Sequence, residues 1–211
     1  MKTIDENRLQ VRVPRMADAP AVAGLINICA IVEIGAVRVT VGRVRREWQI
    51  PGFDLQTDAW LVVAGQGQAV GFAVIQDRYP HVCPAVRICV HPGYIGRGVG
   101  TRLLALAEER ARHRLYRAPA GMRVALYAGA WCVNQMARRL LYGQGYRLVR
   151  RFWRVQAHGD DRLLPAPRSQ RASREAEMEQ VPYRYDVYEK ELRPGMMQPY
   201  DPAFLVDSVN R

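Results

Sequence analysis

Apolar and polar residues alternate along this chain with the two periods that distinguish strands from helices. Residues 9–14 alternate with a period of two, which is typical of an edge strand. Four apolar residues then repeat with helical spacing: Val22, Leu25, Ile26 and Cys29. Asp18 stands ahead of them, where a helix N-cap is expected. The pattern therefore predicts a strand followed by a helix at the start of the fold.

Three short strands are predicted in the next part of the chain, after a short helix over Arg43–Trp48. The β-rich runs Trp60–Ala64 and Ala69–Gln76 are separated by Gly65-Gln66-Gly67, which predicts a hairpin. Val86–Val90 is the third apolar strand, and prolines lie on either side of it.

Helices and strands continue beyond the middle of the chain. The spacing predicts a helix over Thr101–Arg114, a strand over Met122–Ala128 and a helix over Asn134–Tyr142. The pair Gly145-Tyr146 indicates a turn into a further strand. No repeat of fixed period is visible, so the order of these elements has to define the architecture.

The C-terminal part of the chain shows how the domain is organised. Residues 147–155 form a long predicted strand, and a polar stretch over about 156–181 follows, which we interpret as an excursion from the domain. Tyr183–Leu192 regains strand character, and we expect it to pair with the preceding strand. The prediction is thus one domain over residues 1–192 that contains this insertion. A C-terminal tail over 193–211 is expected to pack on the domain or on a second subunit of a homodimer.

Composition narrows the class of protein. With 49% hydrophobic and 24% charged residues, the 211-residue chain has the make-up of a globular protein. We find no unbroken apolar run that is long enough to cross a bilayer. Met1–Gln10 also lacks the apolar stretch of a secretory signal. We therefore expect a cytoplasmic protein without a membrane partner.

The cysteines do not predict a metal site. Cys29, Cys83, Cys89 and Cys132 lack the close paired spacing of a zinc site or a dithiol redox motif. We expect structural thiols and no bound metal. Cys132, near a predicted helix start, has the alternative of an activated nucleophile, because a helix N-terminus lowers the pKa of a thiol.

Positive charge is concentrated in the predicted folded core. The formal net charge is +11, and residues 1–155 hold 23 Arg or Lys against 10 Asp or Glu, whereas residues 156–211 hold 8 against 10. A basic core suits a nucleotide-based cofactor, an acidic substrate or nucleic acid. Nucleic acid is the weaker choice, because strand alternation spreads the aromatic residues of 147–155 over both faces and leaves no single stacking platform.

A glycine cluster, Gly96-Arg97-Gly98-Val99-Gly100, joins the strand Val86–Val90 to the following helix. Glycines let the backbone approach a ligand closely, and free N–H groups at a helix start attract an anion. The arrangement suits a pyrophosphate, with a plain glycine-rich turn as the alternative. A Walker loop is excluded because no Lys follows Gly98, and a Rossmann fingerprint is disfavoured because position 101 is Thr101.

This segment resembles the acetyl-CoA signature of the GNAT superfamily, in which a strand ending Val-x-Pro precedes Q/R-x-x-G-x-G/A and a long helix. Val90-His91-Pro92 supplies the strand end, and Ile95–Gly100 occupies the loop in register. Ile95 departs from the usual Gln or Arg, which should weaken one peripheral contact, since the family binds pyrophosphate mostly through backbone amides. Downstream, Asn134–Tyr142 and then Gly145-Tyr146 match the family's pattern as well.

The resemblance implies a fold and a site. The fold would be α/β (α+β), the GNAT acyl-CoA N-acyltransferase fold, with a mixed, mostly antiparallel sheet that is splayed at its centre and flanked by helices. The pantetheine arm of acetyl-CoA would add to this sheet like an extra strand. The implied cofactor-binding residues are Ile88, Val90, Ile95, Gly96, Arg97, Gly98, Val99, Gly100, Thr101 and Asn134. Tyr142 resembles the tyrosine that protonates the departing thiolate.

The implied reaction is direct transfer of the acetyl group from acetyl-CoA to an amine: a small-molecule amine, an amino acid or a peptide N-terminus. A base must deprotonate that amine. Many family members carry Glu on the strand where this chain has Arg87, so Glu33, Asp58 and His91 stand as alternatives. A non-catalytic acyl-CoA-binding regulatory protein of the same fold stays open, as does, less favoured, a nucleic-acid-binding module.

Overall fold

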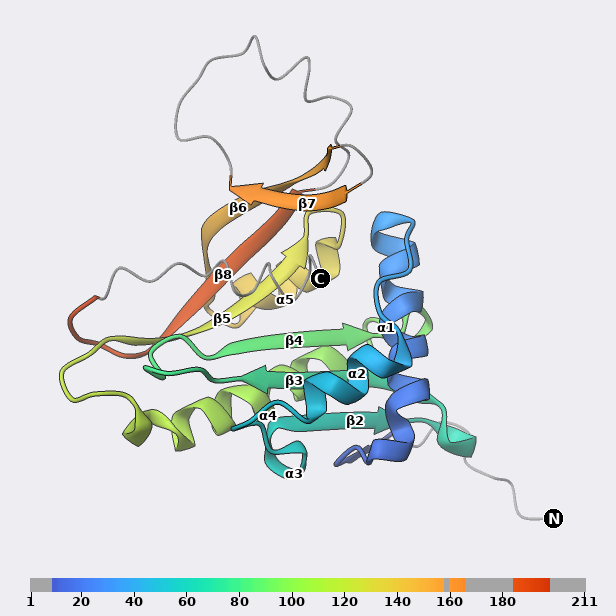
Figure 1. Cartoon of the computed structure of the whole chain (residues 1–211), viewed down its shortest axis with the longest axis horizontal. Helices are drawn as coiled ribbons and strands as arrows, with labels where there is room; N and C mark the ends of the chain where they lie inside the picture. Colours follow the sequence, from blue (N-terminus) through green and yellow to red (C-terminus); the bar gives the residue numbers. More distant parts are fainter. Residues whose placement is uncertain (1–8, 158–159, 166–183, 198–211) are drawn as a thin grey trace, which may run out of the picture.

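Eight strands form one mixed sheet with helices on both faces (Figure 1). The computed structural model describes residues 9–157, 160–165 and 184–197. The strands are β1 (Gln10–Arg12), β2 (Ala59–Val63), β3 (Ala69–Gln76), β4 (Ala85–Val90), β5 (Val124–Trp131), β6 (Arg147–Ala157), β7 (Asp160–Pro165) and β8 (Arg184–Arg193). The helices are α1 (Ala19–Ile34), α2 (Val41–Trp48), α3 (Leu55–Asp58), α4 (Val99–His113) and α5 (Gln135–Gly143). Short 3-10 turns are η1 (Met16–Asp18), η2 (Gly65–Gly67), η3 (Pro92–Tyr94) and η4 (Leu115–Arg117).

The sheet is split at its centre. Its strand order is β1-β2-β3-β4-β5-β8-β6-β7, and the pairs are antiparallel except for β4 and β5, which run parallel. These two strands pair only where Ala85 meets Tyr127 and Val86 meets Ala128, and beyond that point they diverge (Figure 1). The mixed, mostly antiparallel and splayed sheet that the resemblance implied is therefore confirmed.

Side-chain alternation sends successive residues of β4 and β5 to opposite faces of the sheet. Helices α1 and α2 cover one face, where Trp48 packs on Phe72 with ring centroids 6.1 Å apart. Helix α4 covers the other face, where Leu103 and Leu104 are buried against the sheet together with Leu126. Both faces are thus apolar cores, and the split between β4 and β5 opens between them.

Most elements predicted from the pattern are present. The hairpin between β2 and β3 is confirmed, as is the pairing of the strand after residue 183 with the strand over 147–155. Helix α4 begins at Val99, two residues before the predicted start, so that part of the glycine cluster lies in its first turn. Strand β5 begins two residues later than predicted and extends to Trp131.

The predicted excursion is not wholly irregular. Strand β6 continues to Ala157, and residues 160–165 return along it as β7. The polar run Asp160-Asp161-Arg162 shows no strand alternation, so the sequence pattern did not predict β7. This strand forms by pairing with the edge of β6. The remainder of the excursion, 166–183, and the tail beyond residue 197 lie outside the described residues.

Asp18 precedes α1 as predicted, but its side chain does not cap that helix. Both carboxylate oxygens instead accept hydrogen bonds of 2.7 Å from the guanidinium of Arg12. The same carboxylate accepts from the backbone N–H of Arg15 at 2.7 Å. The carboxylate is thus already engaged, and these contacts, that with Arg12 above all, lower the pKa of Asp18.

Helix α1 and the turn before it, Met16–Ile34, are long and apolar enough to cross a membrane by length and composition alone. The run is not unbroken, since Asp18 and Glu33 lie within it, and length and composition alone are weak evidence for a membrane span. In the structure α1 lies against the sheet and buries Leu25 and Ile26, while Ile31 and Val32 are exposed. Its place in the core accounts for much of its apolar character.

Candidate functional site

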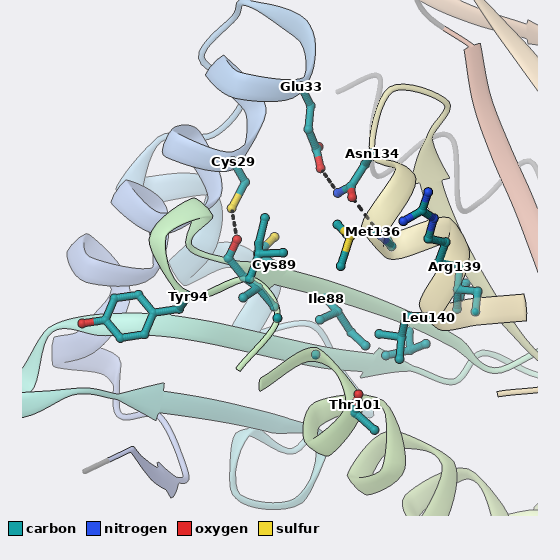
Figure 2. A pocket seen from close by; sticks show the side chains of 18 of the residues that line it. Cys29, Glu33, Ile88, Cys89, Tyr94, Thr101, Asn134, Met136, Arg139 and Leu140 are labelled. Carbon is teal, nitrogen blue, oxygen red and sulfur yellow. Dashed lines mark hydrogen bonds between the residues drawn. The ribbon is translucent and has the colours of Figure 1, made fainter. Parts of the chain in front are cut away.

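A cavity of about 480 Å³ lies at the split between β4 and β5. From the α4 side it is lined by Val86, Ile88, Val90 and Ala128. From the α1 side it is lined by Cys29, Glu33, Cys89 and Gly129. The cavity therefore passes through the sheet and is open to groups from both faces, and its size is that of a small-molecule site. Figure 2 shows Glu33 and Asn134 meeting across it above Ile88.

The glycine cluster forms one wall of this cavity. Gly96 and Gly98 have φ of 80° and 77°, a region that residues with a Cβ rarely adopt. No atom lies within 4 Å of where a Cβ would stand at either glycine, apart from their own neighbours. The first N–H groups of α4 have no partner within the helix, because its hydrogen bonds begin at the N–H of Arg102, which reaches the carbonyl of Gly98. These amides and the helix dipole suit an anion such as a diphosphate.

Eight of the ten residues predicted to bind the cofactor line the cavity. They are Ile88, Val90, Ile95, Gly96, Gly98, Gly100, Thr101 and Asn134. The two others do not line it: the guanidinium of Arg97 lies 4.9 Å from the ring centroid of Tyr94, a residue of the cavity wall, and Val99 is buried in the core. Their part in ligand binding stays a prediction, which their main-chain amides could still fulfil.

One edge of β4 is open toward the cavity. The N–H of His91 bonds the carbonyl of Val70 on β3 at 2.9 Å, so strand alternation turns the main-chain groups of Ile88 and Val90 the other way, toward the split. The carbonyl of Val90 accepts a hydrogen bond of 3.2 Å from the Sγ of Cys29 on α1. The two residues predicted to bond the pantetheine amides thus present their backbone to the cavity.

Glu33 and Asn134 bridge the split from opposite sides. Asn134 is the N-cap of α5, where its Oδ1 accepts from the N–H of Ala137 at 2.9 Å. Its Nδ2 donates to the Oε1 of Glu33 on α1 (Figure 2). Burial raises the pKa of Glu33, and this effect outweighs the opposing ones of Asn134 and of the charge on Arg38. A carboxylate of raised pKa inside a cavity is suited to accept a proton near neutral pH.

The other two base candidates serve the structure elsewhere. Asp58 is 1% exposed and accepts from Arg110 Nε at 3.0 Å and Arg114 Nη2 at 2.9 Å, which ties α3 to the end of α4. The Nδ1 of His91 accepts from the N–H of Gly93 at 3.1 Å and caps η3. Neither side chain lines the cavity, so Glu33 alone of the three candidates reaches it.

Tyr142 is not among the residues that line the cavity. Its side chain is 50% exposed near the end of α5, and its ring lies edge-on to Tyr188 with centroids 5.3 Å apart. Its predicted role as general acid rests on the resemblance and stays a prediction.

Several lining residues were missed as site residues in the sequence. Cys29 and Cys89 were expected to be structural thiols, and both line the cavity. Their mutual hydrogen bond is the main reason why the pKa of Cys89 is lowered and that of Cys29 is raised. Helical spacing was the available signal, because Glu33 follows Cys29 by four positions and shares its face of α1. Residues of α5 complete the wall: Met136, Ala137, Arg139, Leu140 and Leu141.

No group of three His, Cys, Asp or Glu side chains that could hold a metal ion occurs within the described ranges. Among the described residues, the cavity brings together an anion cradle, an open strand edge, a half-buried carboxylate and two thiols.

Comparison with known proteins gives a consistent result. The sequence model described as "Acetyltransferase (GNAT) family" matches residues 36–142. No curated protein is a match. The fold resembles a GCN5-related N-acetyltransferase from Sphaerobacter thermophilus, with a TM-score of 0.74 and 20% identity over 93% of this chain and 99% of that one.

Two further structures share the fold. One is yncA from Salmonella typhimurium, solved with its cofactor acetyl-CoA, with a TM-score of 0.59 and 17% identity over 90% of this chain and 98% of that one. The other is a ribosomal-protein-alanine N-acetyltransferase from Brucella melitensis, with a TM-score of 0.58 and 20% identity over 87% of this chain and 99% of that one. At these identities the likenesses show the fold and leave the acceptor open.

Proposed function

Because the chain belongs to the GNAT acetyltransferase family, we propose that it is an acetyl-CoA-dependent N-acetyltransferase that moves the acetyl group directly to an amine. The observation that carries this proposal is the half-buried carboxylate of Glu33, which lies in the same cavity as the glycine cradle and the open edge of β4. A donor held by the cradle would then share one cavity with this base. The acetyl-CoA found in yncA, which has the same fold, supports the choice of donor.

The residues present fit acetyl-CoA. The amides of the first turn of α4 and the left-handed Gly96 and Gly98 would hold the diphosphate. The open main-chain groups of Ile88 and Val90 would hold the amides of the pantetheine arm. The thioester supplies an activated acetyl group and a thiolate leaving group.

Glu33 would take the proton of the acceptor ammonium ion. A lysine amine, with a pKa of about 10.4, costs roughly 4.6 kcal/mol to deprotonate at neutral pH, whereas an α-amine with a pKa near 8 costs only about 1 kcal/mol. Burial raises the pKa of Glu33 and so narrows its gap to the amine. A single carboxylate base of this kind favours acceptors with an α-amine of low pKa, such as a peptide N-terminus.

Tyr142 remains our proposal for the group that protonates the departing thiolate, on the resemblance already described. A second tyrosine, Tyr185 on β8, has its Oη against Gly129, a residue of the cavity wall. Burial raises the pKa of Tyr185 to about 12, which makes it a weak acid.

The test is Glu33→Gln, which keeps an acceptor for the N–H of Asn134 and removes the base. We expect kcat, measured as thiol release from acetyl-CoA with an amine panel, to fall by about 100-fold or more. The dissociation constant for CoA, measured by calorimetry, should stay within about twofold, because Glu33 does not contact the cradle. The matched control is Glu109→Gln, which removes an exposed carboxylate from α4 and should leave both values unchanged.

The pH dependence gives an independent readout. The base works only when ionised, and the pKa of Glu33 is raised, so the rate should climb as pH rises through that pKa, and Glu33→Gln should abolish this limb. Wild-type turnover in Glu33→Gln would exclude Glu33 as the base. CoA binding without thiol release for any amine would identify a non-catalytic acyl-CoA-binding protein instead, and absence of CoA binding would overturn the proposal.

A further inference from the structure

Two of the four cysteines meet in the cavity, and the proposed transfer of the acetyl group uses neither of them. Cys29 comes from α1 and Cys89 from β4, and both line the cavity wall. Cys29 is a buried member of the apolar cluster between α1 and the sheet, and the partly exposed Cys89 packs against that cluster. Figure 2 shows the two side chains next to each other on the α1 side of the split.

The two thiols are held in contact by a helix and a strand. The thiol of Cys29 donates to the carbonyl of Val90 at 3.2 Å, and Val90 directly follows Cys89 on β4. The same thiol is in hydrogen-bond contact with the sulfur of Cys89. A disulfide needs Cβ atoms about 3.5–4.5 Å apart, so two cysteine side chains in contact are already close to that arrangement. The packing of α1 on the sheet sets this contact, which therefore belongs to the fold.

The contact makes the two thiols chemically unequal. The hydrogen bond from Cys29 is the main reason why the pKa of Cys89 is lowered, and the charge of Arg87 acts in the same direction. Burial and the charge of Glu33 oppose this shift without reversing it. The same hydrogen bond, together with burial, raises the pKa of Cys29. Because the thiolate is the nucleophile, Cys89 is suited to attack and Cys29 to keep its proton as a neighbouring thiol.

The other two cysteines have a different setting. Neither Cys83 nor Cys132 lines the cavity. Burial raises the pKa of Cys83 to about 11, which leaves this thiol mostly protonated at neutral pH. Cys132 follows the end of β5 and is partly exposed. Both residues therefore serve as internal references for the reactivity of the pair in the cavity.

We propose that Cys29 and Cys89 form an oxidant-sensitive site, which hydrogen peroxide converts into a disulfide within the chain. The Cys89 thiolate attacks one oxygen of the peroxide, the O–O bond breaks and hydroxide leaves, so Cys89 becomes a sulfenic acid. Cys29 then attacks this sulfur, the S–O bond breaks, and the proton of Cys29 leaves with the hydroxyl group as water. The two thiols lose two electrons in total, and the peroxide gains them. The cavity of about 480 Å³ gives the peroxide access to Cys89.

The disulfide would change the shape of the cavity. Its sulfur atoms stand about 2.05 Å apart, closer than in any hydrogen bond, so α1 and β4 would be drawn together. Cys29 would lose its proton and with it the bond to the carbonyl of Val90. Glu33 lies one turn further along α1 on the same face, so its carboxylate would shift as well. Formation of the disulfide does not depend on the proposed function, whereas its effect on turnover does.

The experiment treats the whole chain with hydrogen peroxide and then counts its thiols. The reduced protein has four free cysteines, so titration with DTNB after denaturation should find four before oxidation and two afterwards. The intact mass should show the loss of two hydrogens without any gain of oxygen. Peptide mapping should identify the link between Cys29 and Cys89, and dithiothreitol should restore all the thiols.

Single variants separate the roles of the two thiols. Cys29→Ser keeps a hydroxyl donor beside Cys89 but removes the second sulfur, so peroxide should leave Cys89 as a sulfenic acid that dimedone traps. Cys89→Ser removes the nucleophile, and the remaining Cys29 should react more slowly by about tenfold or more. Cys83→Ser is the matched control, because it removes a thiol outside the cavity and should leave the rate of disulfide formation unchanged.

Several results would overturn the inference. They are an undiminished thiol count after peroxide, a link that involves Cys83 or Cys132, and a disulfide between two chains. A gain of oxygen at Cys89 of the wild type, without a link to Cys29, would overturn it as well.

Turnover gives a second readout that depends on the proposed function. The kcat of the oxidised wild type, measured as consumption of acetyl-CoA, should fall by about tenfold or more and return with dithiothreitol. The double variant Cys29→Ser/Cys89→Ser should not respond to peroxide, whatever its basal rate. Unchanged kcat in the disulfide-bonded protein would contradict the predicted shift of Glu33. A reduced protein without any turnover would contradict the acetyltransferase proposal, while the thiol count would still decide the fate of the oxidation site.

Discussion

Gly129 offers a test of the cavity wall that needs no substrate. A Cβ at this position would lie 2.1 Å from Tyr185 Oη, 2.4 Å from its Cζ and 2.6 Å from its Cε1. Tyr185 is 9% exposed and packs edge-on against Trp131 with ring centroids 5.0 Å apart, so it has little room to move away. Gly129→Ala should therefore overpack this part of the core.

The magnitude follows from comparison with a second glycine. Overpacking of a well-packed core costs about 1–3 kcal/mol. Gly24 lies on the exposed side of α1 with no atom within 4 Å of its would-be Cβ, so Gly24→Ala should stabilise the protein by about 0.5–1 kcal/mol. Both changes add one methyl group and restrict the unfolded chain in the same way. The free energies of unfolding of the two variants should therefore differ by roughly 1.5–4 kcal/mol.

Thermal unfolding followed by circular dichroism measures this difference. For a chain of this length, each kcal/mol shifts Tm by about 2–4 °C, so the two variants should separate by about 3–16 °C. A Gly129→Ala protein that melts at or above Gly24→Ala would show that the Tyr185 ring does not lie over Gly129.

Two further predictions concern the general acid and the end of α4. Tyr142→Phe should lower kcat, measured by thiol release, by about 100-fold and leave CoA binding unchanged. Tyr185→Phe should not cause this loss. Equal turnover in Tyr142→Phe and wild type would exclude Tyr142 as the general acid. Asp58→Asn should lower the free energy of unfolding by about 3–5 kcal/mol, because it leaves Arg114 and Arg110 without their buried carboxylate, and a urea midpoint equal to that of wild type would contradict this.

The glycine cradle could be predicted from the sequence because everything it needs is contiguous. The positive φ of Gly96 and Gly98, the strand before them and the helix after them are local properties of one short segment. Each of these properties is indicated by residue types that favour few other conformations. The local pattern also placed Asn134 at a helix start, where the structure has it as the N-cap.

The base could not be chosen from the sequence because its partners are distant. Glu33 and Asn134 are 101 residues apart, and nothing local shows that the two meet across the split. For the same reason the sequence could not exclude Asp58 as the base. The arginines that donate hydrogen bonds to its carboxylate lie more than 50 positions away. Arg87 and Cys89 lie two positions apart and so share one face of β4, but which helix covers that face depends on tertiary packing.

The open edge of β4 links the fold to the proposed chemistry. Buried main-chain groups are nearly always paired, yet β4 and β5 separate after Val86 and leave the backbone of Ile88 and Val90 facing a cavity. Cys29 covers one of these groups, the carbonyl of Val90, through a thiol, which is a weak donor. An amide N–H in the same place would form the stronger bond, so a pantetheine arm that adds along β4 would restore what the split removes. The same separation lets Glu33 reach the cavity from the opposite face, so one break in the sheet would serve both the donor and the base of the proposed reaction.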